Sequence, residues 1–180
     1  YTIMNISDLY ELYLAHPHIT TDSRNCPSNS IFFALKGDNF NGHQYAMQAL
    51  EKGAAYAIID EPLQIHDARC IVVDNVLLTL QDLARFHRKK LTIPVLGITG
   101  SNGKTTTKEL CAAVLRQKYK VHYTKGNLNN HIGVPLTILG ITPDVEFAII
   151  EMGANHPGDI QELVEIALPN YGIITNVGRA

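Results

Sequence analysis

The stretch from Val95 to Thr107, VLGITGSNGKTTT, constrains the chain more than any other segment. An apolar run leads into a loop with two glycines, and Lys104 and Thr105 then open a helix-prone segment. Such a loop can turn its backbone N–H groups toward a phosphate, and the following helix adds its positive N-terminal end. Lys104 can reach the terminal phosphates, and the Thr105 hydroxyl can bind Mg²⁺. The order therefore predicts an α/β fold with a nucleotide-binding loop.

This loop departs from the general phosphate-binding pattern at one position. The general pattern has glycine six residues before the lysine, and this chain has Ile98 there. The segment is therefore a TG-x-x-GK-T variant. An ordinary glycine-rich turn between a strand and a helix is the alternative, and the Lys104–Thr105 pair argues against it.

Composition excludes several classes of protein. Hydrophobic residues make up 46% of the 180 positions and charged residues 18%, which is typical of a chain with a packed core. A formal net charge of −2, with no long basic run, gives no support for nucleic-acid binding. No apolar stretch has transmembrane length, and nothing resembles a signal peptide, so we expect a cytoplasmic protein without membrane insertion. Three widely spaced cysteines, Cys26, Cys70 and Cys111, fit reduced packing residues rather than disulfides.

The apolar pattern predicts two domains. Residues 1–88 are expected to form a small α/β domain, with strands at 31–35, 55–59 and 70–73 and helices at 42–52 and from 76 onward. Residues 89–180 alternate strands and helices, which predicts a parallel sheet with right-handed crossovers. The expected strands there are 94–99, 120–124, 146–151 and 171–177, and the expected helices are 104–118, 134–139 and 158–167.

Two further segments are expected at the same edge of the second sheet as the nucleotide loop. Glu151 ends an apolar strand, and its carboxylate suits Mg²⁺, although a charged residue that merely marks a strand end is the alternative. The loop after it contributes Asn155 and His156 as candidate substrate contacts. The loop from Thr124 to Pro135 contributes three asparagines, Asn127, Asn129 and Asn130, which supply amide donors or serve turn formation.

These segments together resemble the Mur ligase family of bacterial cell-wall synthesis. TGSNGKTTT looks like the ATP loop of the family, and GNLNNHIGVPLTIL and EMGANHPGDI look like the member that adds D-Ala-D-Ala to UDP-MurNAc-tripeptide. At the N-terminal end, TDSR and IFFALKGDNFNGH resemble the UDP-binding domain of that member. The resemblance covers nearly the whole chain.

The resemblance implies a role for each matching residue. Lys104 is the catalytic residue that it implies, and Thr105 and Glu151 are the magnesium ligands. The residues implied to hold the phosphates of ATP are Gly100, Ser101, Asn102, Gly103, Lys104, Thr105 and Thr106. Those implied to lie near the uridine diphosphate are Ser23, Arg24, Asp38, Asn39, Phe40, Gly42 and His43. The loop residues Asn127, Asn129, Asn130, Asn155 and His156 would line the place where nucleotide and peptide substrate meet.

The resemblance also implies an activity: ATP-dependent amide formation in peptidoglycan synthesis, with ATP and Mg²⁺ as cofactors, by a monomeric enzyme. It implies further parts that we expect beyond residue 180, among them a metal-binding histidine, a carbamylated lysine and a C-terminal domain. We therefore expect this fragment to be inactive alone. A ligase that adds the third residue to UDP-MurNAc-dipeptide and a nucleotide-binding module without catalysis remain alternatives. A folate-polyglutamate ligase would share the nucleotide loop, but the N-terminal domain argues against it.

Overall fold

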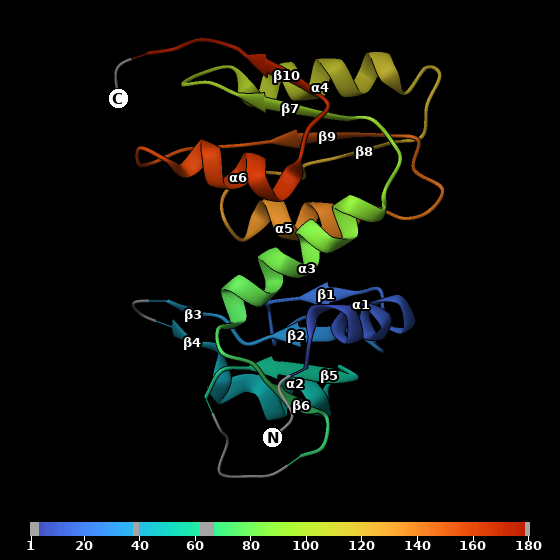
Figure 1. Ribbon diagram of the computed structural model, residues 1–180, viewed down its shortest axis with the longest axis vertical. Coiled ribbons are helices and arrows are strands. Elements are labelled where there is room, and N and C mark those ends of the chain that lie inside the picture. The colour runs from blue at the N-terminus through green and yellow to red at the C-terminus, as the bar shows by residue number, and fades with distance from the viewer. Residues whose placement is uncertain (1–3, 38–39, 62–66, 179–180) are drawn as a thin grey trace. The chain divides into compact units, whose positions relative to one another are not determined.

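The computed structural model describes residues 4–37, 40–61 and 67–178, and these form two compact units, 1–83 and 84–180. The division falls inside one helix, α3 (Val76–Lys90). Figure 1 shows the order of the elements along the chain.

The first unit is a small α/β unit around a parallel sheet of order β1-β2-β5-β6. Its elements are α1 (Ile6–Ala15), β1 (Ile19–Thr20), β2 (Ile31–Phe33), β3 (Lys36–Gly37), β4 (Phe40–Asn41), the 3-10 helix η1 (Gly42–Tyr45), α2 (Ala46–Glu51), β5 (Tyr56–Ile59) and β6 (Cys70–Val72). The strands β3 and β4 form a separate antiparallel pair. The predicted helix at 42–52 therefore begins as a tighter 3-10 turn.

The core of the first unit lies between α2 and the sheet. Phe32, Ala57 and Ile59 from the strands pack with Ala49 and Leu50 of α2. Cys26 and Cys70 pack against the same cluster as free thiols, as predicted. Helix α1 was not predicted, although Asn5 caps it by accepting a hydrogen bond from the Asp8 N–H at 2.9 Å.

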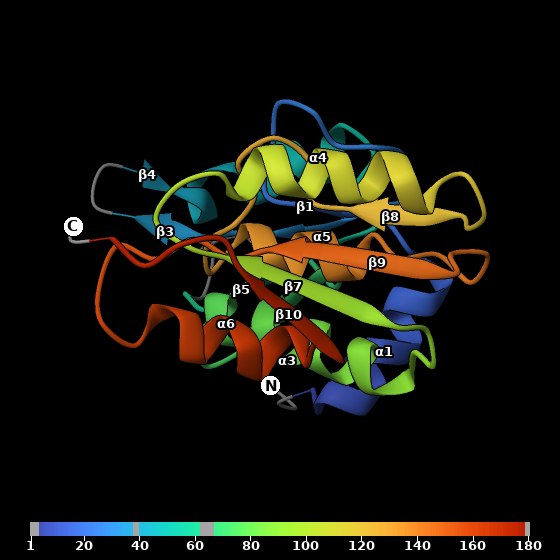
Figure 2. The same cartoon turned by 90° about the horizontal axis from the view of Figure 1, so that it is seen from above.

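The second unit has the predicted alternation of strands and helices. Its elements after α3 are β7 (Val95–Thr99), α4 (Lys104–Leu115), β8 (Val121–Tyr123), α5 (Gly133–Leu139), β9 (Phe147–Glu151), α6 (Asp159–Ala167) and β10 (Tyr171–Ile174). All four strands are parallel, in the order β10-β7-β9-β8. Helix α4 covers one face of this sheet, and α5 and α6 cover the other (Figures 1 and 2).

Helices α3 and α4 differ in how their apolar residues are buried. The apolar face of α3, which comprises Val76, Leu80, Leu83 and Ala84, is buried together with His87. Burial lowers the pKa of His87, and its ring nitrogen lies 3.1 Å from the Ile141 carbonyl, so it is a packing histidine. In α4, Leu110 and Val114 have helical spacing but are 63% and 71% exposed, whereas Lys108 is buried.

Membrane insertion was not expected, and within the described ranges no helix has both the length and the hydropathy that a bilayer-spanning segment needs.

Candidate nucleotide site and the UDP-side residues

The loop after β7 has the backbone shape that phosphate binding requires. Gly100 has φ +134° and Gly103 has φ +79°, a region that disfavours residues with a Cβ atom. A Cβ at Gly100 would also lie 2.1 Å from the Thr175 hydroxyl oxygen, so this position excludes any larger residue. Gly103 directly precedes α4, whose first residue is Lys104. The N-terminal end of a 12-residue helix therefore faces the loop.

Residues that follow β10 hold this loop in place, and sequence reasoning did not single them out. The Asn176 side chain accepts from the Asn102 N–H at 2.9 Å, and the Thr175 hydroxyl donates to the Asn102 carbonyl at 2.5 Å. The Ser101 hydroxyl accepts from the Gly178 N–H at 2.9 Å. The parallel pairing of β10 with β7 explains these contacts, because it brings the ends of both strands to one edge.

Lys104 lies partly buried in the first turn of α4. Its ammonium donates to the Gly100 carbonyl at 2.6 Å, so it lies across the loop. Thr105 and Thr106 follow it and are exposed. The hydrogen bond to a neutral carbonyl leaves the ammonium with donors for an anionic ligand.

Glu151 is the buried centre of the side chains around this loop. It pairs with Ile98 across β9 and β7, so it lies at the predicted edge, and its side chain is only 1% exposed. The Thr105 hydroxyl lies 3.2 Å from each carboxylate oxygen, and the Asn129 amide donates to Oε1 at 2.9 Å. The Glu151 N–H donates to the Thr124 hydroxyl at 2.9 Å.

The oxygen atoms of Glu151 and Thr105 are suitable ligands for a magnesium ion. A hard divalent cation prefers a small set of protein oxygens and completes its shell with phosphate and water. The Thr105 hydroxyl and the Glu151 carboxylate are within hydrogen-bonding distance of each other, so both could serve one ion at the mouth of the loop. Their role as ligands remains a prediction.

A hollow of about 610 Å³ opens beside the loop. It is lined by Gly100, Ser101, Asn102 and Lys104 on one side and by Asn155 and His156 on the other. The backbone N–H groups of Asn155 and His156 donate to Asp159 at 2.8 and 2.9 Å, and these bonds lower the pKa of that carboxyl group. The His156 side chain is 82% exposed, and its Nδ1 lies 3.8 Å from Asp159 Oδ2.

The three asparagines of the 124–135 loop have different surroundings. Asn129 contacts Glu151, as described above. The Asn130 side chain accepts from the N–H groups of Ile132 and Gly133 at 3.1 and 2.8 Å, so it stabilises the start of α5. Asn127 is exposed. Only Asn129 therefore has a side-chain contact that ties it to Glu151.

On the first unit, the TDSR turn is held by its own side chains. The Arg24 guanidinium donates twice to the Asp22 carboxylate, each time at 2.9 Å. These bonds lower the pKa of Asp22 to about 2. Ser23 is buried, whereas the Arg24 side chain is 84% exposed. Of the two, only Arg24 presents its side chain to solvent.

The other predicted UDP-side residues lie around the β3–β4 pair. Asp38 and Asn39 fall outside the described residues. Phe40 is exposed and stacks on Tyr45, with ring centroids 5.5 Å apart. The Gly42 N–H donates to the Leu35 carbonyl at 2.8 Å, which fixes the turn into η1.

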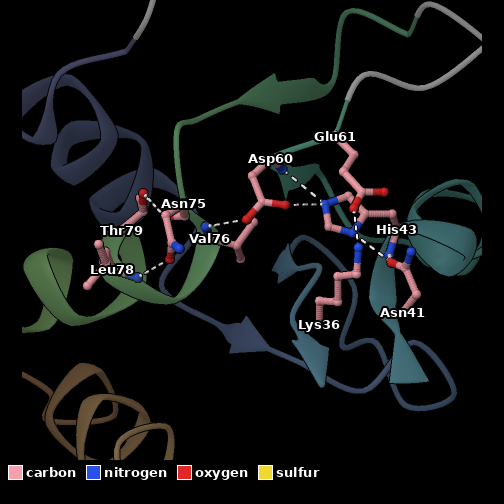
Figure 3. Close-up of polar contacts among 9 residues, drawn as sticks. All are labelled: Lys36, Asn41, His43, Asp60, Glu61, Asn75, Val76, Leu78 and Thr79. Carbon is pink, nitrogen blue, oxygen red and sulfur yellow. Dashed lines mark hydrogen bonds and ion pairs between the residues drawn. The ribbon is translucent and has the colours of Figure 1, made fainter. Parts of the chain in front are cut away.

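His43 is buried and engaged at both ring nitrogens (Figure 3). Nδ1 lies 2.8 Å from Asn41 Oδ1, and Nε2 lies 2.8 Å from Asp60 Oδ1. The second Asp60 oxygen accepts the Val76 N–H at 2.9 Å, where α3 begins, and Glu61 pairs with Lys36. His43, Asp60 and Glu61 lie close enough to hold a metal ion, but each is already satisfied by protein groups. We interpret this cluster as structural.

Two protein-family models match this chain. The model of the Mur ligase family, catalytic domain, matches residues 17–118, and that of the Mur ligase middle domain matches residues 98–180. The chain belongs to the Mur ligase family. Within this family the resemblance seen in the sequence is confirmed, and so is the α/β fold with parallel sheets.

Two relatives in sequence carry the same name. UDP-N-acetylmuramoyl-tripeptide–D-alanyl-D-alanine ligase of Bacillus subtilis is 40% identical over 99% of this chain, and that of Synechocystis is 46% identical over 91%. These alignments cover 41% and 36% of the two relatives. This Mur ligase chain therefore spans about two fifths of the curated relatives that it matches.

Solved structures agree. MurF of Acinetobacter baumannii superposes with a TM-score of 0.86 at 34% identity, covering 94% of this chain and 41% of the other. MurF of Thermotoga maritima, a complex with ADP, gives a TM-score of 0.84 at 36% identity, covering 93% and 39%. A UDP-N-acetylmuramoyl-L-alanyl-D-glutamate–2,6-diaminopimelate ligase gives 0.56 at 20% identity, which shows a shared fold alone.

Proposed function

We propose that this chain forms the UDP-substrate-binding and ATP-binding part of a ligase that joins D-Ala-D-Ala to UDP-MurNAc-tripeptide in peptidoglycan synthesis. The observation that carries the proposal is the buried Glu151 beside a glycine-bounded loop with Lys104 and Thr105. The identity with relatives of that name supports the choice of substrates over those of the third-residue ligase. In this proposal residues 1–88 bind the UDP end and residues 89–180 bind ATP.

The proposed reaction makes an amide from a carboxylate, which needs an activated leaving group. A carboxylate oxygen of the tripeptide attacks the γ-phosphorus of ATP, the bond to the bridging oxygen breaks, and an acyl phosphate and ADP form. The amine of D-Ala-D-Ala then attacks the acyl carbon, loses a proton, and inorganic phosphate leaves. Both reactants of the first step are anions, so the site must offset their repulsion.

The residues of this chain would do so in three ways. Backbone N–H groups from Gly103 to Thr106, at the N-terminal end of α4, would hold the phosphates, whereas those of Ser101 and Asn102 donate to Asn176. Lys104 would move from the Gly100 carbonyl to the terminal phosphates. Thr105 and Glu151 would hold magnesium, which neutralises phosphate charge when it is bound. Asn155 and His156, across the hollow, are placed to contact the substrate.

Binding of ATP tests the proposal directly. Titration of the chain with ATP and MgCl2 in a calorimeter should show binding that Lys104→Ala weakens by about 1.5–3 kcal/mol, the range for hydrogen bonds to charged groups. Lys118→Ala is the matched control, because Lys118 is exposed just beyond the other end of α4. Equal affinities for the chain and the Lys104 variant would exclude this loop as the ATP site.

Binding of UDP-MurNAc-tripeptide tests the role that is proposed for residues 1–88. UDP-MurNAc-tripeptide should shift amide resonances near Ser23 and Arg24, and UDP alone should reproduce part of that pattern. Shifts confined to residues after 94 would place the UDP end elsewhere. A nucleotide-binding module without catalysis would bind ATP but show no response to UDP-MurNAc-tripeptide.

A further inference from the structure

Lys108 is a fully buried lysine that the proposed chemistry does not use. It lies in α4 one helical turn after Lys104, and it is 0% exposed. Lysine is almost never fully buried without a partner, because removing an ammonium from water is costly. Its surroundings should therefore explain why the chain keeps a charge at this position.

The main partner of Lys108 is Glu151. Its ammonium lies 3.3 Å from Glu151 Oε2, and both side chains are buried, so each is the other's chief counter-ion. The ammonium also lies 6.0 Å from the centroid of the Tyr123 ring, and two further polar groups approach it. Glu109 Oε1 lies 3.5 Å away on a side chain that is 52% exposed, and the Gly126 carbonyl lies 3.4 Å away. Glu109 is largely hydrated, so it cannot replace Glu151 as the buried partner.

The two oxygens of the Glu151 carboxylate have different partners. The ammonium of Lys108 approaches Oε2 at 3.3 Å, whereas the Asn129 amide donates to Oε1 at 2.9 Å. The Thr105 hydroxyl lies 3.2 Å from both oxygens, at the side of the nucleotide loop. The carboxylate is thus held in one orientation, with its charge already balanced from inside the protein.

We propose that Lys108 is a positioning residue that makes magnesium binding at Glu151 conditional on bound nucleotide. The proposal rests on the proposed ATP site. Without nucleotide, the Lys108 ammonium already neutralises the Glu151 carboxylate, so a free divalent cation gains little by entering. With the phosphates of a nucleotide in the loop, negative charge is in excess, and the same Thr105 and Glu151 oxygens can take the cation.

Three variants separate this role from that of an ordinary structural pair. Lys108→Met keeps much of the apolar stem and removes the charge, Lys108→Arg keeps the charge, and Lys108→Met with Glu151→Gln removes both charges. Each variant of the chain is melted with and without MgCl2 in the absence of nucleotide, at matched ionic strength set with NaCl. Calorimetric titration with MgCl2 alone measures the affinity, and a second titration of the unaltered chain with ADP present measures how far nucleotide raises it.

For the unaltered chain and Lys108→Arg, we expect no response to MgCl2 alone. Lys108→Met should gain melting temperature with MgCl2 and bind it at least ~10-fold more tightly than the unaltered chain, which is about 1.4 kcal/mol. The double variant should lose that response. If Lys108→Met is unfolded without the metal, recovery of its helical circular dichroism on addition of MgCl2 alone is the supporting result.

Three results would overturn the proposal: a folded Lys108→Met that ignores MgCl2, an unfolded one that MgCl2 does not rescue, or an unaltered chain that binds Mg²⁺ as tightly without ADP as with it. Failure of the proposed function is distinguishable from all three. If the unaltered chain binds no ATP, the nucleotide site is wrong, whereas the response of Lys108→Met to MgCl2 still reports on the Lys108–Glu151 pair.

Discussion

Each unit of this chain has a parallel strand that runs into a carboxylate, and the two carboxylates have different surroundings. Asp60 follows β5, and Glu151 ends β9. The oxygens of Asp60 are taken by His43 and by the Val76 N–H (Figure 3), so they join β5 to α3. Glu151 instead faces Thr105, Asn129 and Lys108 beside a glycine-bounded loop. A carboxylate at a strand end therefore signals a site only when the side chains around it can also serve a ligand.

Of these changes, replacement of Glu151 should have the largest effect, on both the stability of the protein and its binding of ATP. Glu151→Gln leaves the Lys108 ammonium buried without its main partner, and loss of one member of a buried pair costs roughly 3–5 kcal/mol. ATP binding should also need more MgCl2 than in the unaltered chain. Urea denaturation and ATP titration at several MgCl2 concentrations measure both effects. Glu162→Gln is the control, because its side chain is 66% exposed. An unchanged magnesium dependence would remove Glu151 from the metal site.

Asp60→Ala should affect only the stability of the protein. The change removes the acceptor for the Val76 N–H and the carboxylate partner of His43, and losses of this kind cost about 2 kcal/mol. The Asp60 backbone N–H, which still donates to His43 Nε2, is unaffected. Affinity for ATP should not change, because Asp60 belongs to the first unit. Asp60→Asn keeps one acceptor oxygen and should cost less. A loss of ATP binding in Asp60→Ala would contradict the structural role assigned to this cluster.

Lowering the pH should destabilise the two units to different extents, and this effect should be smaller than those of the substitutions above. Burial lowers the pKa values of His87 and His122, both in the second unit, below 6.5. The unfolded chain then binds more protons, so their contribution to the free energy of unfolding falls as pH drops through 6.5. In the first unit, Asp22 has its pKa lowered from 3.8 to about 2, so its contribution is lost only below pH 3.8.

Hydrogen exchange at pH 7 and pH 5 measures this difference unit by unit. The second unit should lose protection first, and His87→Gln or His122→Gln should reduce that loss. Equal loss of protection in both units would show that other groups control the response to acid.

The smallest effect on stability is expected at Arg24. Its side chain is 84% exposed, so loss of its pair with Asp22 should leave the free energy of unfolding almost unchanged. Affinity for UDP should nevertheless fall. Arg69→Ala is the matched control, because Arg69 makes the same two contacts to Asp67 two residues earlier in the chain. Equal UDP affinities for both variants would remove Arg24 from the proposed UDP site.

Periodicity predicted most of the fold, because strands and helices of ordinary length carry their own pattern. The strands β7 and β9 and the helices α5 and α6 lie within one or two residues of their predicted bounds. The short strands β1, β3 and β4 have two residues each, too few to show any pattern, and they were missed. Helix α1 was missed although Asn5 and Asp8 mark its start.

The candidate site was predictable where residues follow one another and not where the fold brings them together. The loop from Gly100 to Thr106 could be identified from adjacent residues alone. Thr175 and Asn176 could not, because their role depends on β10 lying next to β7. Nothing in the sequence around Lys108 marks it as buried, and its buried carboxylate partner, Glu151, comes from the separate strand β9.

The contacts of Thr175 and Asn176 bear on how the protein is made. The loop is held by hydrogen bonds to residues that are translated at least 73 positions later. Among them, the Asn102 N–H donates to the Asn176 side chain, and the Gly178 N–H donates to the Ser101 hydroxyl. On the ribosome, we therefore expect the segment from Gly100 to Gly103 to lack its final backbone conformation until residues 175–178 have left the exit tunnel. A nascent chain halted before that point should be unable to retain ATP, even with its Lys104 and Thr105 already exposed to the cell.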